Sequence, residues 1–151
     1  MRLAVPALVA ATLLSAPAAQ ADHSRRHMTV FKTPGCECCS AWAAIAREHG
    51  FEVTLEERED MEAIKDRLGV VEAVRSCHTT SVDGYVVEGH VPMTAVKKLL
   101  SERPRVTGIG APGMPMGSPG MGDDPRARFD VLSFGGTQPH ARAVFFEAGK
   151  D

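Results

Sequence analysis

MTVFKTPGCECCSAW, residues 28 to 42, contains a strand pattern, a turn and three cysteines in immediate succession. Residues 28–33 alternate apolar and polar side chains and are rich in β-forming residues, which predicts a strand. A Pro-Gly pair breaks that strand, and apolar side chains then recur at helical spacing over residues 38–48. The stretch therefore predicts a strand and a helix joined by a cysteine-rich turn.

Regular patterns continue to about residue 102. They predict a strand over 51–57, a short helix over 61–70 capped by Asp60, a hairpin over 79–91 turning at Asp83-Gly84, and a helix over 93–102. The strand–helix–strand start favours parallel pairing through a right-handed crossover, and the hairpin adds antiparallel strands. We expect an α/β fold with a mixed α+β sheet of four strands, a thioredoxin-like βαβαββα core.

The composition changes over residues 104–127, which hold six of the 14 glycines, five of the 10 prolines and three of the seven methionines. Glycine and proline both oppose regular structure, so we expect a Gly/Pro/Met-rich loop without helix or strand. Two strand-like segments follow, RFDVLSF and ARAVFFEA, with Gly135-Gly136 between them. They predict an added C-terminal β-hairpin.

The first 21 residues have the pattern of a secretory signal peptide, with one basic residue, a short apolar stretch and an A-x-A site at Ala19–Ala21. We expect cleavage after Ala21, a flexible tail over 22–27 and one metal-binding domain over 28–151. The net charge of −2 argues against a nucleic-acid partner. Nothing after the signal is apolar for long enough to insert into a membrane. A periplasmic protein is therefore predicted.

The cysteines admit three interpretations: a disulfide, a dithiol redox centre or metal ligands. Cys36 and Cys39 lie at a helix start, where thiolate is favoured, and thiolate serves as both nucleophile and ligand. A dithiol oxidoreductase, however, has no use for the third thiol, Cys38. Such enzymes also place a cis-proline before the third strand, where this chain has Cys77-His78. A disulfide between Cys36 and Cys39 remains open, and it does not exclude metal binding after reduction.

Soft ligands distinguish the candidate metals. Four thiols, the neighbouring imidazole of His78 and the thioethers of the loop form a set that selects Cu(I), with imidazole also suited to Cu(II). Zinc is the rival, but structural zinc sites rarely use methionine. The number of ligands exceeds the needs of one Cu(I) ion, so more than one copper per chain is expected.

Four motifs, TPGCECCSAW, SCHT, DGYVVEGHVP and PGMPMGSPGM, together resemble the bacterial DUF family 411, the CopG-like copper-resistance metal-binding proteins. The resemblance runs from about Met28 to Phe134. It implies a periplasmic copper-binding protein that works beside copper efflux systems and handles Cu(I) and Cu(II). The ligands it implies are Cys36, Cys38, Cys39, Cys77, His78, His90, Met114, Met116 and Met121.

Several alternatives stay open on the sequence alone. A thioredoxin- or glutaredoxin-like thiol–disulfide oxidoreductase is the main one, and arsenate reductase-like chemistry is a weaker one. His78 can orient its loop through a hydrogen bond, His90 can cap a turn, and the methionines can pack against the sheet. The sequence also leaves open whether the protein is an enzyme or a non-enzymatic copper binder.

Overall fold

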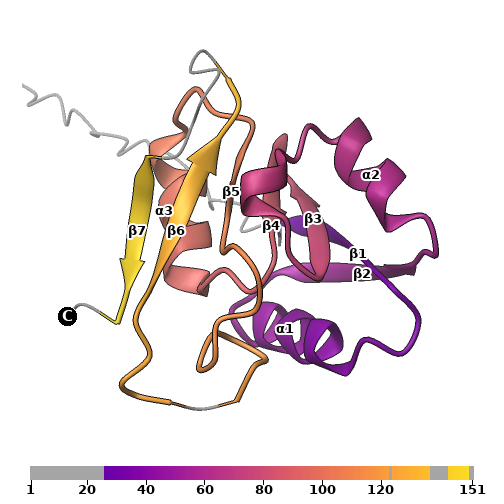
Figure 1. Cartoon of the computed structure of the whole chain (residues 1–151), viewed down its shortest axis with the longest axis horizontal. Coiled ribbons are helices and arrows are strands. Elements are labelled where there is room, and N and C mark those ends of the chain that lie inside the picture. The colour runs from indigo at the N-terminus through magenta and orange to yellow at the C-terminus, as the bar shows by residue number, and fades with distance from the viewer. Residues whose placement is uncertain (1–25, 123, 137–142, 150–151) are drawn as a thin grey trace, which may run out of the picture.

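The computed structural model describes residues 26–122, 124–136 and 143–149 (Figure 1). The predicted signal peptide and most of the predicted tail lie outside these residues. The described elements are β1 (His27–Lys32), α1 (Glu37–Glu48), β2 (Glu52–Glu57), α2 (Met61–Arg67), the 3-10 turn η1 (Glu72–Val74), β3 (His78–Val82), β4 (Tyr85–Glu88), α3 (Met93–Glu102), β5 (Gly108–Gly110), β6 (Phe129–Phe134) and β7 (Val144–Ala148). No helix among them has the length and apolar character that a membrane span requires.

The described strands form one sheet in the order β2-β1-β3-β4-β5-β6-β7. β1 pairs in parallel with β2, and β4 with β5, whereas the other neighbours are antiparallel. The mixed α+β class and the predicted βαβαββα order are confirmed. The expected four strands are β2, β1, β3 and β4, and the sheet extends beyond them to seven.

The expectation that residues 104–127 hold no helix or strand is wrong at β5. Ile109 is fully buried between two glycines. A Cβ atom at Gly108 would lie 1.9 Å from the carbonyl oxygen of Val86, so only glycine allows β5 to approach β4 this closely. The predicted C-terminal hairpin is present as the antiparallel pair β6 and β7, and β5 joins it to the main sheet. Residues 137–142 between β6 and β7 lie outside the described part of the chain.

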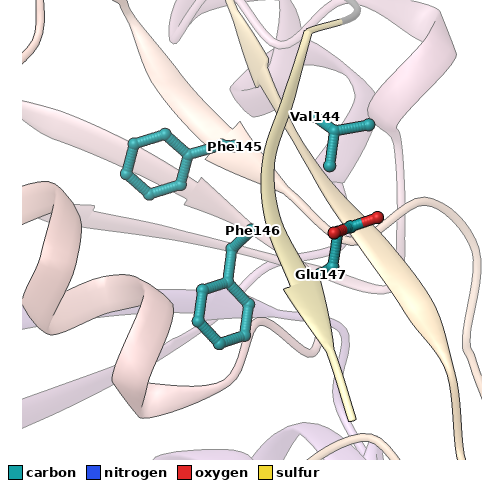
Figure 2. Close-up of a pocket in the computed structure, with 4 residues that line it drawn as sticks. All are labelled: Val144, Phe145, Phe146 and Glu147. Atoms are coloured by element: carbon teal, nitrogen blue, oxygen red, sulfur yellow. The ribbon is translucent and has the colours of Figure 1, made fainter. Parts of the chain in front are cut away.

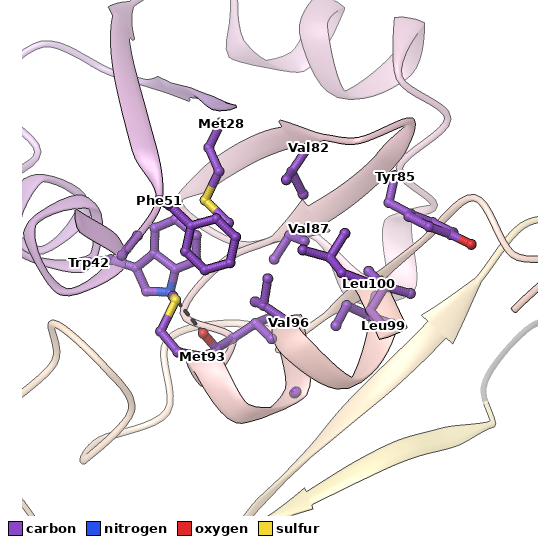
Figure 3. Close-up of a cluster of buried hydrophobic side chains, with 14 of the residues drawn as sticks. Met28, Trp42, Phe51, Val82, Tyr85, Val87, Met93, Val96, Leu99 and Leu100 are labelled. Atoms are coloured by element: carbon purple, nitrogen blue, oxygen red, sulfur yellow. Dashed lines mark hydrogen bonds between the residues drawn. The ribbon is translucent and has the colours of Figure 1, made fainter. Parts of the chain in front are cut away.

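Helices cover both faces of the sheet (Figure 1). On the face of α1 and α3, Trp42 and Leu99 pack with strand residues such as Val87 in the main core (Figure 3). On the face of α2 and η1, Val86 packs with Val74 in a smaller cluster. Because neighbouring strand residues point to opposite faces, β4 and β6 contribute side chains to both clusters.

Asp60 stands at the start of α2 but does not cap it as predicted. Its side chain makes no hydrogen bond to the helix backbone. Both of its carboxylate oxygens instead accept hydrogen bonds from the guanidinium group of Arg58, each at 3.0 Å. The neighbouring cation thus competes successfully for the carboxylate, and α2 begins without a side-chain cap.

Candidate metal centre

Three cysteines stand at the start of α1. Cys36 occupies the N-cap position with an extended backbone, and Cys38 and Cys39 belong to the first turn. Cys39 is fully buried, whereas Cys36 and Cys38 are partly exposed. Cys36 and Cys39 are joined by a disulfide, which is the dithiol pairing that the sequence left open. Cys38 and Cys77 are free thiols.

The four sulfur atoms lie together although Cys77 is distant in sequence. The Sγ atom of Cys38 is 3.6 Å from that of Cys36, and the Sγ atom of Cys77 is 3.6 Å from that of Cys39. All four atoms lie within 4.8 Å of one another. We call Cys36, Cys38, Cys39 and Cys77 the thiol group. Once the disulfide is reduced, this spacing allows several sulfurs to bind one metal ion or to bridge neighbouring ions.

A second set of ligand atoms shares Cys77 with the first. Cys77 immediately precedes β3, His78 begins it, and His90 lies two residues after β4. The β3–β4 pairing continues to this end, because the Gly89 N–H donates to the His78 carbonyl at 2.8 Å. The Cys77 Sγ atom is 2.8 Å from His90 Nε2 and 3.6 Å from His78 Nδ1. We call Cys77, His78 and His90 the thiol–imidazole group.

The hydrogen bonds of His90 define its tautomer. Its Nδ1 atom lies 2.8 Å from the carbonyl oxygen of Pro119. Since a carbonyl only accepts, Nδ1 must carry the proton, and Nε2 of the neutral ring directs a lone pair at the Cys77 thiol. A histidine whose second nitrogen donates to a backbone carbonyl is the usual arrangement for a metal ligand.

Burial controls the charge of the thiol–imidazole group. His78 and His90 are both fully buried, and burial lowers the pKa of each, that of His78 well below its ordinary value. Repulsion from His90, when that ring is protonated, and from the Lys65 ammonium lowers the pKa of His78 further. Burial, followed by the influence of Cys38, raises the pKa of Cys77 to about 12. At neutral pH the metal-free group is therefore two neutral imidazoles and a thiol, and a metal that binds Cys77 displaces its proton.

The Gly/Pro/Met-rich loop contacts this centre through its main chain. Gly120 has φ +85°, and a Cβ atom there would lie 2.6 Å from the carbonyl oxygen of Cys38. Its neighbour Pro119 accepts the hydrogen bond of His90 described above. Met114 and Met116 are 55% and 70% exposed, and Met116 lines a surface pocket with the partly buried Met121. Ligation by the three methionines stays a prediction.

A hollow on β7, by contrast, shows no comparable ligand set. Val144, Phe145, Phe146 and Glu147 line it, and Figure 2 shows both phenylalanine rings on one side of the strand. The Lys98 ammonium lies 4.3 Å from the centre of the Phe145 ring. In the sheet, β4, β5 and β6 separate β7 from β3. This region packs against α3 and carries no cysteine or histidine among its lining residues.

Comparisons with known proteins agree with this centre. Residues 74–121, which include Cys77, His78 and His90, match the family described as "Protein of unknown function, DUF411". A solved structure named "Copper resistance protein copG- Form 2" is similar to the chain, with 39% identity, a TM-score of 0.75 and coverage of 82% of this chain and 98% of that one. Form 1 of the same protein gives 38% identity, a TM-score of 0.73 and the same coverage. The chain belongs to this DUF411/CopG-like copper resistance family. No curated protein matches the sequence.

For this member of the family, sequence reasoning located the four cysteines and both histidines that the fold brings together. It missed Lys65 and Glu88, which form a buried ion pair behind β3. One signal was available: Glu88 is a charged residue in the otherwise apolar strand YVVE. It also missed the Pro119 carbonyl, for which no sequence signal exists, because every residue carries a backbone carbonyl.

Proposed function

We propose that this protein binds copper as its cargo in copper resistance, holding Cu(I) through Cys36, Cys38, Cys39 and Cys77. The observation that carries the proposal is the convergence of four sulfur atoms within 4.8 Å of one another, with Cys77 shared by the thiol–imidazole group. Thiolates select Cu(I), and the neutral imidazoles of His78 and His90 suit copper in either oxidation state.

The size of the ligand set supports more than one copper ion per chain. Four thiolates and two imidazoles exceed the coordination number of a single Cu(I) ion, and the short sulfur–sulfur spacing favours bridging. The donors also discriminate against hard cations such as Mg²⁺ and Ca²⁺, which require oxygen ligands. Met114, Met116 and Met121 add thioethers close in sequence to Pro119, which accepts the hydrogen bond of His90, and are proposed as accessory ligands.

The Cys36–Cys39 disulfide supports a redox component in this function. The disulfide holds neither sulfur as thiolate, so reduction must precede full occupancy of the thiol group. In the reverse direction, two thiols that close to a disulfide release two electrons and two protons. Those electrons balance the conversion of two Cu(II) ions to Cu(I). We propose that the pair interconverts copper oxidation states in this way.

Export is part of the proposal. Residues 1–21 are proposed as a signal peptide cleaved after Ala21, which places the domain over 28–151 in the periplasm. An oxidising compartment is one in which a Cys36–Cys39 disulfide persists. The proposed partners are copper ions and the efflux or other periplasmic proteins that deliver and remove copper.

Anaerobic titration of fully reduced protein with Cu(I), followed by X-ray absorption at the copper edge, tests the copper assignment. We expect sulfur neighbours to dominate, with nitrogen neighbours as the minor component and a copper–copper distance at full loading. Reduced protein that refuses copper, or that retains zinc in preference to it, would falsify the proposal. Cys77→Ser is the informative variant, because it alters both groups.

A dithiol oxidoreductase is the second candidate, and the Cys36–Cys39 disulfide at a strand-to-helix turn is the observation that favours it. The test is insulin reduction by metal-free protein. This candidate requires activity that disappears in Cys36→Ser and survives in Cys38→Ser, which keeps the pair intact. If the parent, Cys36→Ser and Cys38→Ser all reduce insulin equally and the parent binds copper, the oxidoreductase candidate is excluded and the copper function stands.

A further inference from the structure

Lys65 and Glu88 form an ion pair that is nearly sealed from solvent. The Lys65 side chain is 3% exposed and that of Glu88 is 0% exposed, and Nζ lies 2.5 Å from Oε1. Removing two charges from water costs about as much as their attraction returns, so apolar replacements of such pairs are often neutral or stabilising. The pair is therefore not explained by a gain in the stability of the fold, and its role is better inferred from the groups to which it is hydrogen-bonded.

Glu88 holds the chain on both sides of Cys77 and His78. Its Oε1 atom accepts a hydrogen bond from the Ser76 backbone N–H at 2.7 Å, and its Oε2 atom accepts one from the Thr79 hydroxyl at 2.6 Å. Lys65 Nζ also donates to the Thr79 hydroxyl oxygen at 3.0 Å. The two residues held in this way immediately flank the two candidate ligands. One carboxylate thus fixes the residue before and the residue after the Cys77-His78 segment.

The network contacts this segment from the far side of the sheet. Thr79 and Glu88 are cross-strand partners, and both side chains reach Lys65 of α2. His78, the neighbour of Thr79, instead packs against Trp42 of α1, with 4.9 Å between ring centres. The sheet therefore lies between the charged network and the candidate metal ligands. Glu88 is also the last residue of β4, two residues before His90, so the same carboxylate anchors the start of the segment that carries the second imidazole.

We propose that Lys65 and Glu88 are positioning residues for the thiol–imidazole group, which hold Cys77, His78 and His90 in the geometry that binds the metal. This inference rests on the proposed copper function for its consequence but on the metal-free structure for its geometry. Partners of this kind, which orient ligands without touching the metal, typically contribute 10- to 100-fold in metal affinity when they are disrupted.

The test compares three variants with the parent chain. Lys65→Met with Glu88→Leu removes the whole network and leaves no unpaired buried charge. Lys65→Met with Glu88→Gln also removes both charges, but its amide oxygen still accepts a hydrogen bond from Ser76 or Thr79. Leu99→Ala, in the fully buried core on α3, is the control for lost stability without a change to the network.

Two measurements separate positioning from general weakening. In metal-free reduced protein, nitrogen NMR of the imidazole rings should show displaced His78 and His90 signals in the Met/Leu variant and parent-like signals in Leu99→Ala. In competition with a Cu(I) chelator, copper affinity should fall about 10- to 100-fold in the Met/Leu variant. Most of that loss should be recovered in the Met/Gln variant, and Leu99→Ala should retain the parent affinity.

Parent-like ring signals and copper affinity in the Met/Leu variant would overturn the inference, and so would equal changes in Leu99→Ala. If the parent itself binds no copper while the ring signals respond only to loss of the network, the copper function is wrong and the positioning of the imidazoles is upheld. If the Met/Leu variant does not fold, Thr79→Val removes both hydrogen bonds of the Thr79 hydroxyl, the one it donates to Glu88 and the one it accepts from Lys65, and leaves the Lys65–Glu88 ion pair in place. It should then displace the His78 signal from its position in the parent, and an unchanged signal would overturn the inference.

Discussion

The thiol group and the thiol–imidazole group share Cys77 but are built in different ways. Cys36, Cys38 and Cys39 stand within one helical turn, and two of them are partly exposed. His78 and His90 are fully buried; His78 begins β3, His90 follows β4, and the pairing of these two strands brings the histidines together. One group is thus open to reagents and changes with redox state, whereas the other is set by the fold. Under the proposed copper function, we expect the partly exposed thiol group to capture copper and the buried imidazoles to help retain it.

Cys77→Ser should have the largest effect, because it removes the one atom common to both groups. We expect copper affinity to fall by at least about 100-fold, since even partners outside the ligand set contribute 10- to 100-fold. Cys38→Ser, which alters only the thiol group, is the matched variant and should retain more copper. Copper-to-protein ratios after desalting under reducing conditions give the comparison. Equal retention by the two variants would show that Cys77 is not shared.

Oxidation of Cys36 and Cys39 should reduce copper binding by the thiol group and leave the thiol–imidazole group able to bind. With the Cys36–Cys39 disulfide closed, the protein should bind fewer copper ions than the reduced protein, and reduction should restore the number. A Cys36→Ser, Cys39→Ser double variant should show no such dependence. Metal analysis of matched oxidised and reduced samples measures this effect. A stoichiometry unchanged by oxidation would remove Cys36 and Cys39 from the ligand set.

His90→Ala isolates the imidazole contribution. The variant should lose nitrogen neighbours from the copper X-ray absorption spectrum, while sulfur neighbours remain, with affinity reduced about 10-fold or more. His49→Ala is the control, because His49 is an exposed histidine at the end of α1. Retention of all nitrogen neighbours in His90→Ala would assign them to other residues.

Lowering the pH should destabilise the metal-free protein below about pH 6.5, the ordinary pKa of histidine. Burial lowers the pKa of His78, so the unfolded chain takes up a proton there that the folded chain refuses. The free energy of unfolding then falls as pH falls, by up to about 1.4 kcal/mol per pH unit for one such group. Urea unfolding of the parent and of His78→Phe between pH 7.5 and 5.5 measures the contribution. Parallel pH dependence in the two proteins would contradict it.

Met116→Ala should have the smallest effect on folding, because the side chain is 70% exposed. We expect the free energy of unfolding to change by less than about 0.5 kcal/mol. Any loss of copper retention in this variant therefore reports ligation rather than folding. Copper retention equal to that of the parent would show that Met116 is an exposed surface residue and not a copper ligand.

The parts of the fold that depend on local sequence were predictable. The strand, turn and helix around the first cysteines follow from neighbouring residues, and so does the hairpin, whose Asp83 and Gly84 adopt φ +49° and +82°. The three residues of β5 were not predictable, because their glycines become a strand only against the backbone of β4. Pairing with β4 therefore stabilises a strand that the local glycine-rich sequence disfavours.

The same distinction holds in the candidate metal centre. Cysteine and histidine are candidate metal ligands by residue type alone, so the members of both groups could be named from the sequence. The Lys65–Glu88 pair could not, because Lys65 on α2 resembles any helix-surface lysine until the fold buries it against β3 and β4. The tautomer of His90 likewise depends on a carbonyl that only the folded loop brings near.

The path of the loop across the centre has a consequence for the timing of metal exchange. Pro119 accepts the hydrogen bond of His90, and Gly120 fits closely against the backbone of Cys38. The loop therefore cannot lift away without freeing the imidazole and uncovering the first turn of α1 in a single movement. We expect the dwell time of bound copper to follow the opening rate of this loop. A residue larger than glycine at position 120 should then shorten that dwell time without altering any ligand.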